Sequence, residues 1–186
     1  MKSINRKTVL IIGGVIVTLI LLFFLFKSLN KETPFARIQL SPSNIVFNRT
    51  SRSYMDTIVS VGLDKLDMKD IVALVRPLTP DILDAMKSKE PTLDLKAFII
   101  GKDENYVIYI VDLDRTTAIE VLSHELIHLK QTESKQLVKG TKSVLWEGKE
   151  YSPELPYDER PWEKDAFDKQ YSLLNDIKTT LYQENK

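Results

Sequence analysis

His124, Glu125 and His128 are the residues of this sequence whose types and spacing best suit a chemical reaction. The two histidines enclose the glutamate in the segment HELIH, residues 124–128. Because an α-helix has about 3.6 residues per turn, both imidazoles leave the same face of a helix and can share one Zn²⁺ at about 2.0–2.1 Å. Glu125 is then carried beside the metal, where it can take a proton from water. The pattern predicts two metal ligands and a general base.

The composition limits what can complete such a metal site. Both histidines of the chain lie in this motif, and the chain has no cysteine. Since a catalytic zinc usually has three protein ligands and one open position, the third ligand must be an aspartate or a glutamate. Glu163 is favoured because it lies in the first turn of the last predicted helix, a rigid element, and Glu159 is the second choice. The downstream acidic candidates are Glu133, Glu147, Glu150, Glu154, Asp158, Glu159, Glu163, Asp165 and Asp168.

Each of these interpretations has a structural alternative. The histidine motif fixes few positions, so it can also arise by chance on a solvated helix face. Against this, Thr117 and Glu120 have the spacing of a capping box that opens a helix, and Leu122, Leu126 and Leu129 would bury that helix. For Glu163 the alternative is a helix N-terminal carboxylate stabilised by the helix dipole.

The elements that position the motif alternate between helical and extended patterns. We expect, in chain order, a helical region over 51–89 with a second short helix at Ile71–Val75, a helix starting at Thr79-Pro80, a hairpin of strands Leu95–Ile100 and Tyr106–Val111, the motif helix ending near Glu133, strands at 136–139 and 143–146, and a last helix over Pro161–Tyr182.

The N-terminal segment from Thr8 to Phe26 has no charged residue and follows Arg6 and Lys7. At about 1.5 Å of rise per residue it nearly spans a hydrocarbon core of about 30 Å. A cleaved signal peptide is the alternative, but its apolar part is shorter and ends at small residues. We expect a single-pass membrane anchor, with the short basic N-terminus in the cytoplasm and the following domain outside it.

The predicted organisation is a basic tail (1–7), the anchor (8–26), a linker and irregular segment (27–50) and a domain (51–186) that is helical over 51–93. The 26 basic and 26 acidic residues balance, so no basic surplus favours nucleic acid as a partner. The absence of cysteine excludes disulfides and iron–sulfur clusters.

The stretch from Tyr106 to Asp168 resembles minimal zinc peptidase domains of the gluzincin type, and its HELIHLKQ and YDERPWEKDAF segments resemble short bacterial and phage proteins. The resemblance implies an α+β, zincin-like fold in which a small antiparallel sheet packs on the motif helix. It implies Zn²⁺ as cofactor, with His124 and His128 as ligands, Glu125 as general base and Glu163 as third ligand. No spare histidine remains to stabilise an oxyanion, so the candidates for that role are Tyr151, Tyr157 and Arg160.

Two functions are consistent with these patterns. The first is a membrane-anchored zinc metallopeptidase that hydrolyses peptide bonds and binds its substrate backbone along the sheet edge, with Tyr106–Val111 or Ser143–Trp146 as the wall of the cleft. The second is a membrane-tethered zinc-binding interaction or assembly module with a zincin-like fold and no significant catalysis. An intact Glu125 favours the first, because a module without catalysis has no chemical need for that carboxylate.

Overall fold

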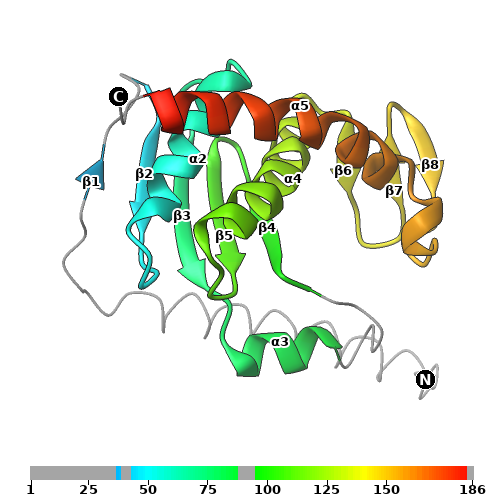
Figure 1. Cartoon of the computed structure of the whole chain (residues 1–186). Helices are drawn as coiled ribbons and strands as arrows, with labels where there is room; N and C mark the ends of the chain where they lie inside the picture. The colour runs from blue at the N-terminus through cyan, green and yellow to red at the C-terminus, as the bar shows by residue number, and fades with distance from the viewer. Residues whose placement is uncertain (1–36, 39–42, 88–94, 184–186) are drawn as a thin grey trace, which may run out of the picture. The chain divides into compact units, whose positions relative to one another are not determined.

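The computed structural model of the chain describes residues 37–38, 43–87 and 95–183 (Figure 1). The predicted membrane anchor, Thr8–Phe26, lies outside the described residues, as does the basic tail. Within the described ranges, no helix has the length and apolar character needed to cross a membrane.

The described elements alternate between strands and helices. In chain order they are β1 (Arg37–Ile38), β2 (Ile45–Asn48), α2 (Tyr54–Lys65), β3 (Val72–Pro77), α3 (Pro80–Lys87), β4 (Ala97–Lys102), β5 (Asn105–Ile110), α4 (Arg115–Glu133), β6 (Leu137–Lys139), β7 (Val144–Trp146), β8 (Lys149–Tyr151), the 3₁₀ turn η1 (Tyr157–Glu159) and α5 (Pro161–Gln183). The predicted α+β class is confirmed.

The main sheet is mixed. Its strand order is β1-β2-β3-β5-β4, with β2, β3 and β5 parallel and the outer strands β1 and β4 antiparallel to their neighbours. The expectation of a small antiparallel sheet therefore holds only for the second sheet, β6-β7-β8. Helix α2 is the crossover between the parallel strands β2 and β3, whereas α3 and the antiparallel strand β4 connect β3 with its parallel partner β5.

The predicted second helix at Ile71–Val75 is wrong, because this segment begins β3. Ala73 and Val75 are fully buried on the helical side, whereas Val72 and Leu74 are half-buried on the other face. A strand that is apolar on both faces lacks the polar alternation that distinguishes a strand from a helix in sequence. The region expected to be helical, 51–93, thus contributes a central strand, and β2 lies within the segment expected to be a linker.

Three helices, α2, α4 and α5, lie on one face of the main sheet (Figure 1). The core between them contains fully buried side chains from each layer, such as Ile58 of α2, Ile108 of β5, Leu126 of α4 and Ile177 of α5. Gly62 of α2 permits close packing here, because a Cβ at this position would lie 2.4 Å from Leu126 Cδ1. The motif helix is therefore held rigidly on both sides.

Helix α4 begins earlier than the predicted capping box. Its cap is Asp114, whose carboxylate accepts from the backbone N–H of Thr116 at 2.9 Å and of Thr117 at 3.1 Å. Thr117 is itself inside the helix and donates its hydroxyl to Asp114 at 2.6 Å. The predicted end at Glu133 is confirmed, so the helix carries the histidine motif in its interior, where the backbone is regular.

The hairpin and the second sheet largely follow the sequence. The β4–β5 turn is shorter than predicted, because Asp103 and Glu104 adopt left-handed φ values of 51° and 69° that allow a tight connection. The strands predicted around Gly140 are confirmed as β6 and β7, and β8 was missed. A separate apolar cluster anchors this second sheet, and its buried residues are Leu137, Val144, Trp146 and Trp162.

Candidate metal centre

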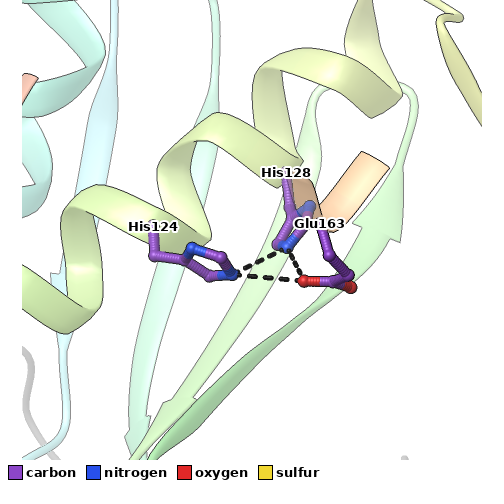
Figure 2. A group of neighbouring side chains, drawn as sticks. All are labelled: His124, His128 and Glu163. Carbon is purple, nitrogen blue, oxygen red and sulfur yellow. Dashed lines mark hydrogen bonds and ion pairs between the residues drawn. The ribbon is translucent and has the colours of Figure 1, made fainter. Parts of the chain in front are cut away.

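Helices α4 and α5 bring His124, His128 and Glu163 together (Figure 2). The histidines point from one face of α4 toward the first turn of α5. The two Nε2 atoms are 3.1 Å apart, and Glu163 Oε2 lies 3.3 Å from His124 Nε2 and 3.0 Å from His128 Nε2. The structure thus joins the predicted ligands of the motif to the favoured third residue.

The separations of these atoms fit a shared metal ion. Three ligands at about 2.0–2.1 Å from a tetrahedral Zn²⁺ would lie about 3.3–3.4 Å from one another, and the observed values of 3.0–3.3 Å need little adjustment. The side chains are 12%, 11% and 10% exposed for His124, His128 and Glu163. A buried cluster of this kind, two imidazoles and one carboxylate, could hold a metal ion.

The far ring nitrogen of each histidine contacts a glutamine. His124 Nδ1 lies 3.0 Å from Gln170 Oε1, and His128 Nδ1 lies 2.8 Å from Gln131 Oε1. When each Nδ1–H donates to its amide oxygen, each neutral imidazole presents a lone pair at Nε2. Two such lone pairs and a carboxylate oxygen then converge on one point, which favours a cation there.

Sequence reasoning missed both glutamines. Asp165, one of the acidic candidates for the third ligand, contacts one of them, because its carboxylate accepts from Gln131 Nε2 at 2.9 Å and pairs with Lys169 at 2.7 Å. Asp165 therefore contacts the ring of His128 only indirectly, through Gln131. The available signal for Gln131 was its i+3 spacing from His128, which puts both residues on the same helix face.

The remaining acidic candidates stand apart from this cluster. Among the described residues, the group of side chains able to share one ion consists of His124, His128 and Glu163. Glu159, the second choice, is exposed in η1. Helix position explains the difference, because Glu163 lies in the first turn of α5 and packs with the buried Trp162 and Ala166, 4% and 0% exposed.

Glu125 is half-buried and lines the same cleft as the three clustered side chains. Burial raises the pKa of its carboxyl, and the nearby histidines partly oppose this effect. A carboxyl whose pKa is raised toward neutrality is better suited to accept and return a proton than an ordinary surface glutamate.

The cleft has a volume of about 1600 Å³ and runs between β4 and the η1 region. Its sheet-side wall differs from the prediction, because β4 and not β5 is the edge strand. Tyr106 of β5 does line the cleft, but most of the sheet-side lining residues belong to β4, with Leu137, Val138 and Lys139 of β6 beyond them. Among the described strands, the outermost one at this end of the main sheet, β4, therefore lies beside the motif helix.

Of the three predicted oxyanion candidates, the structure brings Tyr157 to the site. Burial is the largest cause that raises the pKa of Tyr157, and the charge of Glu163 and a hydrogen bond with it raise that pKa further. Tyr151 instead packs edge-on against Trp162 at 6.1 Å between ring centroids, and Arg160 donates to the Leu155 carbonyl at 2.8 Å. Tyr157 thus keeps a protonated hydroxyl next to the clustered ligands.

Comparison of the chain with protein-family models, with curated proteins and with solved structures found no match. The function of this chain is therefore inferred from the geometry of its own residues, above all from the three converging donor atoms.

Zinc affinity is expected to rise with pH up to the pKa of His128. Burial lowers the pKa of His128, but the hydrogen bond and the charge of Glu163 outweigh this effect and raise that pKa above its usual value. The same contacts with His124 and His128 overcome burial and keep the pKa of Glu163 low, so the carboxylate stays ionised. A zinc ion coordinated by His128 would have to displace the proton of that ring, so each pH unit below the pKa of His128 should weaken binding about tenfold. Competition titrations with a chelating dye over a pH series measure this, and an affinity independent of pH contradicts it.

Proposed function

We propose that this chain is a zinc metallopeptidase with a zincin-like fold of the gluzincin type. His124, His128 and Glu163 hold Zn²⁺, and Glu125 is the general base. The observation that carries the proposal is the convergence of three donor atoms, 3.0–3.3 Å apart, beside a glutamate whose pKa is raised. A purely structural zinc site is usually closed by four protein ligands, whereas three are gathered here next to a large open cleft.

The placement of the motif helix supports the zincin-like fold. Helix α4 lies on the face of a mixed sheet and packs against its antiparallel edge strand β4, and α5 supplies the third ligand from its first turn. This arrangement leaves the strand edge, the motif and the cleft on one side, where an extended chain has access to all three.

Each side chain has a separate task in the proposed reaction. Zinc in such a site supplies Lewis acidity toward a peptide carbonyl and an attacking water. Glu125 takes a proton from the water and gives it to the leaving amine. Tyr157 donates its hydroxyl to the oxygen that gains negative charge, a role for which its raised pKa keeps the proton in place.

The proposed substrate is a peptide or an unfolded protein segment. Strand β4 is the outermost strand at its end of the described sheet, so its outer edge can pair with an added strand. Several residues that line the cleft are apolar and exposed, including Ile100 at 47%, Val138 at 45% and Phe167 at 44%. Such a surface suits side chains of an extended chain. With Thr8–Phe26 as anchor, the enzyme would act on chains near a membrane surface.

The proposal is tested by metal removal. The purified protein is incubated with a denatured protein substrate, with zinc present and after a chelator has removed it. We expect cleavage that disappears with the chelator and returns with added zinc. Cleavage that persists without zinc would contradict the mechanism, and zinc binding without cleavage of any substrate would favour the interaction module instead.

A further inference from the structure

We propose that Gln131 is a positioning residue that fixes His128 and Glu163 relative to each other in the metal site. The inference rests on the proposed function, because it concerns the site at which that function places zinc. Gln131 lies on α4, three residues after His128, and is 1% exposed. A polar side chain buried this completely is normally retained only where its hydrogen bonds are satisfied.

Both the oxygen and the nitrogen of the Gln131 side-chain amide make hydrogen bonds. Its Oε1 lies 2.8 Å from His128 Nδ1, and its Nε2 donates to the Trp162 carbonyl at 3.0 Å and to Asp165 Oδ2 at 2.9 Å. The two N–H groups are thus matched to two acceptors, and the oxygen is matched to one ring nitrogen. In the core around it, no other orientation of this amide satisfies all three contacts.

This orientation determines the tautomer of His128. A carbonyl and a carboxylate can only accept, so the amide nitrogen must face Trp162 and Asp165. The amide oxygen therefore faces His128 and requires a hydrogen on Nδ1. A neutral imidazole with its hydrogen on Nδ1 has its lone pair on Nε2, and that is the atom that meets Glu163 at 3.0 Å.

The same side chain also locates the third ligand. The Trp162 carbonyl belongs to the peptide bond that leads into Glu163, so the contact with Gln131 holds the backbone at that point. One amide thereby ties the ring of a ligand on α4 to the first turn of α5. Gln170 differs, because its Oε1 lies 3.0 Å from Nδ1 of the other histidine, His124.

The test compares three variants of the full chain, Gln131→Met, Gln131→Glu and Gln170→Met. Methionine has similar length but only a weak acceptor, so Gln131→Met is expected to lose about 10- to 100-fold in zinc affinity. Glutamate still accepts from Nδ1, so Gln131→Glu should keep the tautomer of His128. Gln170→Met is the matched control, because it should alter the ring of His124 and leave that of His128 unchanged.

The tautomer is read directly from ¹⁵N NMR of histidine-labelled, metal-free protein at a pH where His128 is neutral. The chain has 2 histidines, so the two ring spin systems are separable. We expect hydrogen on Nδ1 of His128 in wild type and in Gln131→Glu, and a mixture with the Nε2 form in Gln131→Met. Should Gln131→Met fail to fold, the glutamate variant still decides, because hydrogen on Nε2 in it would overturn the proposal.

Two results would refute the role of Gln131. One is an unchanged His128 tautomer in folded Gln131→Met, and the other is wild-type zinc affinity in that variant. These results differ from failure of the proposed function. A wild-type chain that binds no zinc, or binds it without cleaving peptides, would refute the metal site or the catalysis, and the tautomer measured without metal would still decide the claim about Gln131.

Discussion

Replacing Glu125 by glutamine is expected to reduce peptide cleavage by about 100- to 10,000-fold, the usual contribution of a general base. Glutamine has the same shape but cannot take a proton from water. The three side chains proposed to bind the metal are unchanged, so zinc affinity should stay within about threefold of wild type. Initial rates on a denatured protein and zinc titration of the same preparation measure both quantities.

Glu120→Gln is the matched control for this experiment. Glu120 lies on the same helix and lines the same cleft, but it is exposed and outside the metal cluster. The Glu120→Gln variant should cleave at the wild-type rate.

The cleavage rate of Tyr157→Phe is expected to lie between the rates of Glu120→Gln and Glu125→Gln, with a loss of about 100-fold from one missing oxyanion donor. Equal rates for Glu125→Gln and wild type would rule out the proposed mechanism.

Loss of a ligand should have the largest effect on zinc binding. We expect His128→Ala to weaken zinc by more than about 100-fold, beyond the loss for a residue that only supports a ligand. The reason is geometric, because two donors remain where three are needed. Binding also stabilises the fold, so wild type at zinc concentrations about 100 times Kd should gain about 2.7 kcal/mol, and the variant should gain far less. Calorimetric titration and thermal unfolding with and without zinc measure these effects.

The identity of the third ligand is tested by a pair of substitutions. Glu163→Gln removes the buried carboxylate that meets both histidines, and Glu159→Gln removes the exposed carboxylate that was the second choice from sequence. We expect the first variant to lose zinc affinity strongly and the second to bind as wild type does. If Glu159→Gln lost zinc affinity and Glu163→Gln did not, Glu159 would be the third ligand, and the position of Glu163 on α5 would not explain zinc binding.

Local patterns predicted the parts of this fold that depend on neighbouring residues. The motif helix, the last helix and the hairpin each have their own periodicity and boundary residues, so their existence could be predicted from the chain. Strand β3 could not, because its parallel partners are distant in sequence and both of its faces carry apolar residues. The helix start was misplaced because Asp114 and Thr117 are both good caps, and it is the extended backbone of Asp114 itself that makes it the cap.

The candidate site shows the same division. His124, Glu125 and His128 were predicted from helical spacing. The absence of other ligand types required an acidic third residue, and Glu163 was favoured among the candidates for its place in the last predicted helix. Gln131 and Gln170 could not be found in this way, because each reaches the cluster only through the histidine ring that it contacts. Recognising that contact requires knowing how α4 and α5 pack.

Trp162 and Ala166 belong to different hydrophobic clusters, the first to that of the small sheet and the second to the main core. Glu163 lies between them at the seam, while both histidines come from a helix fixed in the main core. A metal ion bound there would link the main core to the hydrophobic cluster of the second sheet. Linkage then works in both directions: a small rotation of the second sheet would change how tightly the ion is held, and the bound ion would suppress that rotation.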